Sequence, residues 1–134
     1  MKNAIFAACL TISFPALALD IQEAKSNVGL EFAECGNYYV LVREGADRSL
    51  PSGPERDKAM ADQQRLAEFA FQMAAELANQ EIALARIKFS MESMRRKMHN
   101  SFEYLSVVAA EYAFPCKDLM EAPDKRLQFW LKKN

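Results

Sequence analysis

The sequence lacks the short motifs by which many catalytic and ligand sites are recognised. It contains no His-Glu-x-x-His, no glycine-rich phosphate loop and no aspartate-rich calcium loop. The only histidine is His99, and Ser101, two positions away, would point elsewhere on a helix, which does not favour a hydrolase triad. The absence of Cys-x-x-Cys argues against a thiol-exchange enzyme. We therefore interpret the chain as a non-enzymatic protein and expect no cofactor.

The sequence also lacks an excess of charge of one sign. Its 17 basic and 18 acidic residues give a net charge of −1. Nucleic-acid-binding proteins usually present a strongly basic face, so the balance gives no support for a nucleic-acid partner. Past the N-terminus, no apolar run approaches the 20 or so residues that a membrane-spanning helix needs. We expect no transmembrane segment in the mature chain.

The N-terminus has the organisation of a secretory signal peptide. Lys2 precedes an uncharged apolar run over residues 4–14, Pro15 ends the run, and Ala16-Leu17-Ala18 follows. Small residues at the first and third positions before a cut are those that signal peptidase accepts. We predict that residues 1–18 form a removed signal peptide and that residues 19–134 form a single domain, which is periplasmic or secreted. The alternative is a short N-terminal anchor.

The cysteine content fits an exported protein. Removal of the signal peptide takes Cys9 with it and leaves Cys35 and Cys116. An even pair of cysteines in an oxidising compartment indicates a disulfide. We predict a Cys35–Cys116 bond that closes a loop of about 80 residues.

Residues 20–44 carry an apolar stripe at helical spacing. The stripe steps by three or four positions through Ile21, Ala24, Val28, Phe32, Cys35, Tyr39 and Val42. Such spacing lines one face of a helix, so the disulfide should be buried. Gly29, Ala33 and Gly36 form a neighbouring stripe without bulk. We expect another helix or the disulfide partner to approach closely there; the alternative is a slot for a ligand.

A linker is predicted over residues 45–54, which contain Gly45, Pro51, Gly53 and Pro54. Ser52 and Glu55 have the spacing of a capping box, and proline is tolerated in a first helical turn. The next helix should therefore start at the end of this linker.

Residues 55–114 contain neither proline nor glycine and carry a long apolar stripe. Its positions alternate steps of four and three: Leu66, Ala70, Met73, Leu77, Gln80, Leu84, Ile87, Met91, Met94 and Met98. This 3.5-residue period is typical of helices that pack in a left-handed manner. One unbroken helix over residues 55–112 would be about 85 Å long, so we predict a break at 99–101 near Asn100, with Asn79 as a weaker candidate. The 66–98 stripe could instead join two copies as a homodimer.

The C-terminal part contains two further prolines. Pro115 is expected to end the preceding helix or to open the next, and Pro123 to open a final short helix. The predicted fold class is therefore all-α: a small helical bundle of about four helices, closed by one disulfide.

A methionine cluster suggests one metal hypothesis. Met91, Met94 and Met98 share a helical face, and His99 follows them. Thioether and imidazole groups are ligands for copper in an oxidising compartment. The same methionines lie in the apolar stripe, where methionine fills core gaps, and we therefore favour a core role and predict no metal site.

A surface for a protein partner is the other candidate site. Arg95, Arg96 and Lys97 form a basic patch at the end of a helix that is acidic at its start, although compensation of the helix dipole explains them as well. Aromatic residues are enriched at interfaces, and Tyr38 and Trp130 are the aromatic residues we expect to be exposed.

Three functional hypotheses follow. The first is an exported binding protein that acts through contact with another protein, such as an inhibitor, an immunity protein or an adaptor. The alternative is an envelope stress chaperone that exposes its apolar helix faces, since methionine-rich surfaces adapt to many clients. The third is a methionine-rich copper-binding protein.

Overall fold

A computed structural model of the protein describes residues 15–133, which form five α-helices and one short 3-10 turn. The helices are α1 (Pro15–Ser49), α2 (Pro54–Ala78), α3 (Gln80–Lys97), α4 (Leu105–Glu121) and α5 (Pro123–Lys133), with the 3-10 turn η1 (Phe102–Tyr104) before α4. The all-α prediction is confirmed, with five helices in place of about four. Residues 1–14 of the predicted signal peptide lie outside the described residues, and the predicted cut after Ala18 falls within α1.

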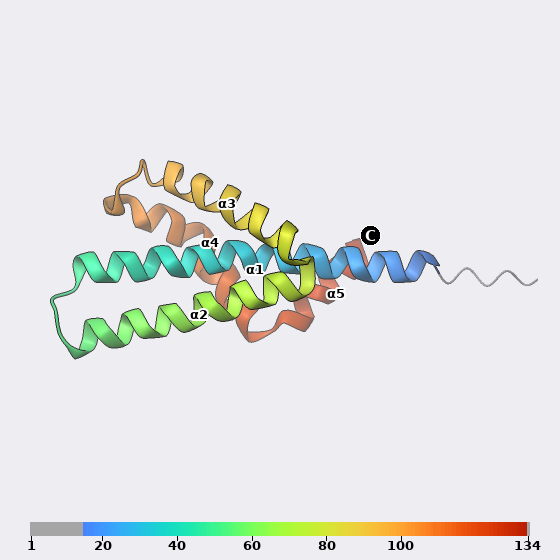
Figure 1. Ribbon diagram of the computed structural model, residues 1–134, viewed down its shortest axis with the longest axis horizontal. Helices are drawn as coiled ribbons and strands as arrows, with labels where there is room; N and C mark the ends of the chain where they lie inside the picture. Colours follow the sequence, from blue (N-terminus) through green and yellow to red (C-terminus); the bar gives the residue numbers. More distant parts are fainter. Residues whose placement is uncertain (1–14, 134) are drawn as a thin grey trace, which may run out of the picture.

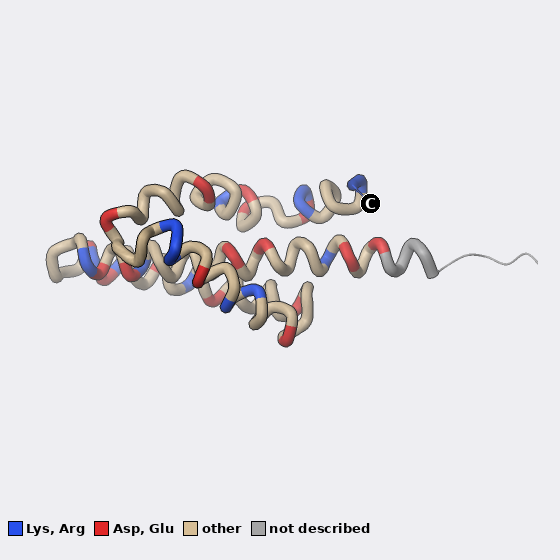
Figure 2. The backbone as a smooth tube through the Cα atoms, turned by 90° about the horizontal axis from the view of Figure 1, so that it is seen from above, with Lys and Arg blue, Asp and Glu red and all other residues tan. Residues whose placement is uncertain are grey.

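Helix α1 is the axis around which the other helices pack (Figure 1). Helix α2 runs antiparallel along it, and α3 returns obliquely across it. Helices α4 and α5 lie along one side of α1 and bring the C-terminus back toward the N-terminal end of α1 (Figure 2). The five consecutive residues 35–39 of α1 are all buried, which covers more than one complete turn of helix. Over this segment α1 has no face left for solvent.

The first loop is shorter than the sequence indicates. Helix α1 continues to Ser49, whose hydroxyl donates a hydrogen bond to the Gly45 carbonyl at 2.7 Å, so the linker is reduced to residues 50–53. The expected capping box is absent, because Gly53 is the N-cap residue of α2 and no side chain caps this end. Pro54 is the first residue of α2, as expected. Gly45 lies within α1 and faces Leu105, where a Cβ atom would lie 2.6 Å from Cδ2.

The long segment without proline or glycine is broken twice. The break predicted near Asn100 is confirmed, with positive φ angles of 49° at His99 and 56° at Asn100. The weaker candidate, Asn79, is also a break: its φ is 70°, and its Oδ1 accepts a hydrogen bond of 3.0 Å from the Ile82 amide. Asparagine tolerates this left-handed backbone better than most residues. The two breaks divide this segment into α2, α3 and α4, each of which packs against α1.

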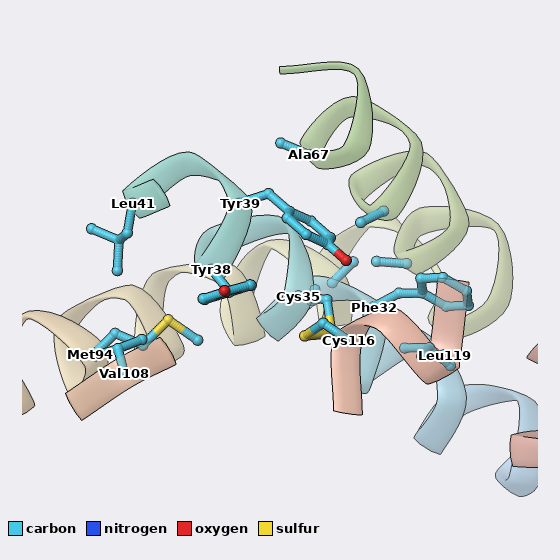
Figure 3. Close-up of a cluster of buried hydrophobic side chains, with 14 of the residues drawn as sticks. Phe32, Cys35, Tyr38, Tyr39, Leu41, Ala67, Met94, Val108, Cys116 and Leu119 are labelled. Carbon is cyan, nitrogen blue, oxygen red and sulfur yellow. A yellow bond between two sulfur atoms is a disulfide. The ribbon is translucent and has the colours of Figure 1, made fainter. Parts of the chain in front are cut away.

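The core lies where α1, α2, α3 and α4 meet (Figure 3). Its largest fully buried side chains include Phe32, Leu41, Met94, Met98 and Val108. Helix α2 contributes only small buried residues to it: Ala67, Ala70, Ala74 and Ala78. Small side chains allow two helix backbones to approach closely, and α2 accordingly makes the most extensive contact with α1.

The stripe of small residues on α1 faces α2, as expected of a close helix approach. A Cβ atom on Gly29 would lie 2.7 Å from the backbone nitrogen of Ala78, and one on Gly36 would lie 2.3 Å from the ring of Phe71. Real Cβ atoms do not approach other atoms this closely, so Gly29 must be glycine because its neighbour is backbone, whereas a larger residue at position 36 would displace the Phe71 ring. The space is therefore filled by α2 and is not a slot for a ligand.

The disulfide between Cys35 and Cys116 is present and joins α1 to α4 across 81 residues of sequence. Cys116 is fully buried and Cys35 is 4% exposed, which confirms the prediction of a buried bond. Structural disulfides form and persist in oxidising compartments, so the bond indicates that the chain folds in a non-reducing environment.

A polar contact inside the core ties α1 to α3. Asn37 is 1% exposed, and its Nδ2 donates hydrogen bonds to the Ile87 carbonyl at 2.6 Å and to the Ser90 hydroxyl at 2.7 Å. Buried polar groups require such partners, because an unpaired group forfeits its hydration without compensation. The contact fixes the angular position of α3 on α1.

Candidate protein-binding surface

Helix α4 exposes apolar side chains on its outer side. Between Leu105 and Cys116 the only charged residue is Glu111, so this helix has little polar surface to turn outward. Its inner side buries Val108, Cys116 and Leu119. The outer residues, which together with Tyr104 of η1 we call the α4 face, are exposed: Tyr104, Val107, Ala110, Ala113 and Phe114.

Phe114 is the most exposed large apolar residue of the α4 face. Its side chain is 77% exposed, against 47% for Val107 and 45% for Tyr104. A single exposed apolar residue is ordinary on a protein surface, whereas several on one face mark a contact site. The α4 face therefore has the composition of the apolar centre of a protein interface.

Phe114 also lines a groove beside the disulfide. This groove, between α1, α4 and α5, has a volume of about 450 Å³. The disulfide, Leu119 and Pro115 supply apolar parts of its lining. Four carboxylates and one guanidinium supply its charged lining: Glu31, Glu34, Glu111, Asp118 and Arg126. The α4 face and the groove are thus one continuous surface, apolar along the helix and acidic beside it.

Pro115 lies inside α4, which runs on to Glu121, so the prediction that it ends or opens a helix is wrong. An internal proline removes one backbone hydrogen bond and crowds the preceding turn. Here the helix is held on both sides of the proline by buried residues, since Val108 precedes it and Cys116 and Leu119 follow it. Tertiary packing and the disulfide therefore maintain the helix through a position that an isolated peptide would not tolerate.

Ion pairs partly neutralise the acidic lining and hold α5 in place. Arg126 binds Glu31 through two hydrogen bonds of 2.7 and 2.6 Å, and the indole nitrogen of Trp130 donates to the same carboxylate at 3.2 Å. The hydrogen bonds to Glu31 raise the pKa of Arg126. This triple contact matters because α5 has no fully buried residue of its own.

The remaining carboxylates differ in their partners. Glu34 pairs with Arg86, and Glu111 accepts a hydrogen bond of 2.6 Å from Lys97. Asp118 is exposed and, within residues 15–133, has no basic group at ion-pair distance. The groove can therefore accept a cation from outside at Asp118 without breaking a contact.

Two tyrosines, one in the core and one packed against it, have raised pKa values. Burial raises the pKa of Tyr39 to about 12, with Tyr38 and Glu121 adding to the effect. Burial likewise raises the pKa of Tyr112 to about 12, and the neighbouring carboxylates of Glu34 and Glu111 oppose its ionisation further. Both rings therefore stay protonated in the folded chain above the pH at which a free tyrosine ionises.

We expect the free energy of unfolding to fall as the pH rises from about 10 to 12. In this range the unfolded tyrosines lose their protons while the folded ones keep them, so the unfolded chain binds fewer protons and gains stability relative to the folded chain. The contribution is complete below pH 10 and is lost as the pH passes the raised pKa. Urea unfolding across this range measures it. Tyr112→Phe should flatten the fall, and an unchanged slope in that variant would refute this origin.

The predicted partner residues do not form one surface. Tyr38 is 8% exposed, so the prediction that it is exposed is wrong; it is buried because α1 is covered on all sides at this point. Trp130 is half-buried against Glu31. In the basic patch, Arg95 bonds Glu44 and Lys97 bonds Glu111, whereas Arg96 is exposed. The patch is therefore divided between internal ion pairs and one outward cation.

The methionine cluster is part of the core. Met94 and Met98 are 0% and 1% exposed and pack in the central cluster. His99 is exposed, and its ring stands edge-on to Tyr104 with 5.3 Å between centroids. The thioethers thus lie in the core and the imidazole lies at the surface, which favours the core role of the methionines over the copper hypothesis. In the part of the chain that the structure describes, no group of three His, Cys, Asp or Glu side chains is arranged to hold a metal ion.

The sequence reasoning missed Phe114 and Asn37. A signal for Phe114 is present in the sequence, because the near absence of charge from Leu105 to Cys116 leaves a helix without a polar face. No comparable signal marks Asn37, whose role depends on α3 lying across α1.

Comparisons with known proteins give no match: no family model, no curated protein and no solved structure resembles the chain significantly. None of the helices within residues 15–133 is both long and apolar enough to cross a membrane.

Proposed function

We propose that the chain is an exported protein, periplasmic or secreted, that acts without catalysis by binding another protein. An inhibitor, an immunity protein and an adaptor are the types of protein that fit this description. The buried disulfide and the signal-like N-terminus support export. The α4 face supports binding, because a rigid helix cross-linked to the core presents its apolar residues without an ordering cost.

The observation on which the proposal depends is Phe114, 77% exposed at the junction of the α4 face and the acidic groove. An exposed aromatic residue beside a groove is the usual form of an interface anchor. The partner segment should place apolar side chains on the α4 face and a lysine or arginine near Asp118. Charge complementarity of this kind speeds association and rejects acidic segments.

Site-specific crosslinking tests the proposal. A photoreactive amino acid in place of Phe114 should capture one stoichiometric partner from the chain's own envelope fraction at neutral pH. The same group in place of Lys58, whose side chain on α2 is 80% exposed, is the matched control and should capture none. Adding Asp118→Lys to the Phe114 probe should reduce capture about tenfold, because the new lysine would repel the lysine or arginine that the partner is expected to place there. Equal capture from both positions would contradict a defined interface.

The second candidate function is an envelope chaperone. Helix α3 already exposes Leu84 (57%) and Phe89 (58%), which belong to the apolar stripes of the long helical segment. Many clients captured only at acid pH, rather than one partner at neutral pH, would favour this function over the first.

A further inference from the structure

Helix α3 has an outer face that is separate from the α4 face. Its inner side buries Ala83, Ser90 and Met94. Three large apolar residues outside this inner side are exposed, with fractions of 43% for Ile82, 57% for Leu84 and 58% for Phe89. Ile82 and Phe89 share one edge of the outer face, and Leu84 lies on the other edge. In Figure 2, α3 crosses over α1 as an outer element of the fold.

The charged residues of α3 divide into two groups. Arg86, Arg95 and Lys97 each pair with a glutamate of α1 or α4. The outward group consists of Glu81, Lys88, Glu92 and Arg96, and none of these four has an ion-pair partner among residues 15–133. Along the helix their signs alternate, from an acidic start at Glu81 to a basic end at Arg96.

We infer that this α3 face binds a second copy of the same chain, as an antiparallel helix pair with a twofold axis beside Phe89. An interface of this symmetry must be self-complementary, because each patch meets its own copy. An antiparallel arrangement places residues equally far before and after position 89 opposite each other. Phe89 then packs against Phe89 of the second copy, which buries the apolar centre of the face.

The charges agree with the same register. Glu81 lies eight positions before Phe89 and Arg96 lies seven positions after it, so each Glu81 stands opposite an Arg96 of the other copy. Lys88 lies one position before Phe89, and Glu92 lies three positions after it. In the antiparallel pair, Lys88 of one copy is therefore offset from Glu92 of the other by two residues, or about 3 Å along the helix axis at 1.5 Å per residue. The Glu81–Arg96 pairs are therefore the attractive contacts that favour this register, since Lys88 lies at the same axial offset from Lys88 of the other copy as from Glu92.

The earlier prediction of a dimer through the whole 66–98 stripe needs correction on this basis. Ala70, Met94 and Met98 of that stripe are buried within the chain. The break at Asn79 turns the stripe outward only at Gln80 and Leu84. The α3 face uses the outward part together with the neighbouring Ile82 and Phe89. One helix from each copy is a small interface, so we expect a dissociation constant in the micromolar range.

Sedimentation velocity over a concentration series tests the dimer. The wild-type chain should pass from monomer to dimer, and Phe89→Glu should remain monomeric. Arg96→Glu should weaken the dimer at least about tenfold, because it sets two pairs of carboxylates against each other. The double exchange Glu81→Arg/Arg96→Glu should restore dimerisation to within about threefold of wild type, since opposite charges meet again.

The controls separate this inference from the proposed function. Lys132→Glu reverses an exposed charge on α5 and should leave the dimer unchanged. Crosslinking from Phe114 should also be unaffected by Phe89→Glu, because the two faces lie on different helices. A wild-type chain that stays monomeric into the millimolar range would overturn the inference. The inference would also be overturned if the double-exchange variant dimerised as weakly as Arg96→Glu alone.

Discussion

Replacing Cys35 and Cys116 together by alanine should lower the free energy of unfolding by about 4–5 kcal/mol, the value that the chain-entropy model gives for a loop of this length. The bond closes a loop of 81 residues and is the only covalent tie between α1 and α4 in the described chain. Its loss frees the unfolded chain while the folded core stays packed. For a domain of this size the melting temperature should fall by about 10–20 °C.

The measurement is urea unfolding of the chain from Leu19 onward, which lacks Cys9, followed by circular dichroism. The wild-type chain in reductant is the matched control and should lose the same stability once the bond is broken. Because both sulfur atoms are buried, reduction should be slow in the native state and fast in urea. A double alanine variant that melts within about 2 °C of wild type would show that the bond contributes little.

The elements of this fold that could be predicted from the sequence depend on local pattern. The disulfide follows from parity of cysteines in an exported chain. The helices follow from 3.6-residue spacing, and the turns at Asn79 and Asn100 follow from the tolerance of asparagine for a positive φ. For the helices and turns the evidence lies within a few residues of the feature, and for the disulfide it lies in the count of cysteines; in each case the structure agrees.

The elements that could not be predicted depend on which helices become neighbours. Tyr38 lies beside the apolar stripe of α1 and would be exposed on an ordinary surface helix. It is buried because α1 is the central helix, contacted by each of the other four. Gly45, which the sequence places in the linker, is a buried residue of α1 that faces Leu105, sixty residues away. No window of local sequence contains that information.

The candidate surface also depends on which helices become neighbours, and local sequence did not predict it. The basic patch at Arg95, Arg96 and Lys97 is a single feature in the sequence, but ion pairs with Glu44 and Glu111 divide it in the folded chain. Phe114 precedes a proline and a cysteine, which suggested the end of a helix rather than an exposed anchor. Its exposure follows from α4 continuing through Pro115 while the disulfide fixes the inner side.

Asn37→Asp should be the most destabilising single substitution of a polar residue, with an expected loss of about 3–5 kcal/mol at neutral pH, the usual cost of an unpaired buried charge. The amide nitrogen of Asn37 donates to the Ile87 carbonyl at 2.6 Å. An aspartate oxygen at that position can only accept, so two acceptors would face each other in a site that is 1% exposed.

The loss should depend on pH with a defined sign. Burial of the new carboxyl raises its pKa above that of an exposed aspartate, so the folded variant keeps its proton to a higher pH than the unfolded variant does. The unfolded variant then binds fewer protons at neutral pH, and the stability of Asn37→Asp relative to wild type falls as the pH rises through this range. At acid pH the protonated carboxyl donates to Ile87 and part of the loss is recovered. Urea unfolding at acid and neutral pH measures both values.

Asn37→Leu is the control that separates charge from the hydrogen bond. It removes the amide that donates to the Ser90 hydroxyl and the Ile87 carbonyl, leaves the hydroxyl its own hydrogen bond of 3.4 Å to that carbonyl, and should cost about 1–3 kcal/mol, independent of pH. Asn37→Leu/Ser90→Ala removes both partners, so the double variant should be more stable than the sum of the single losses implies. If Asn37→Asp were as stable as Asn37→Leu at neutral pH, the carboxylate would have to reach solvent, and α3 would not be fixed on α1 by this contact.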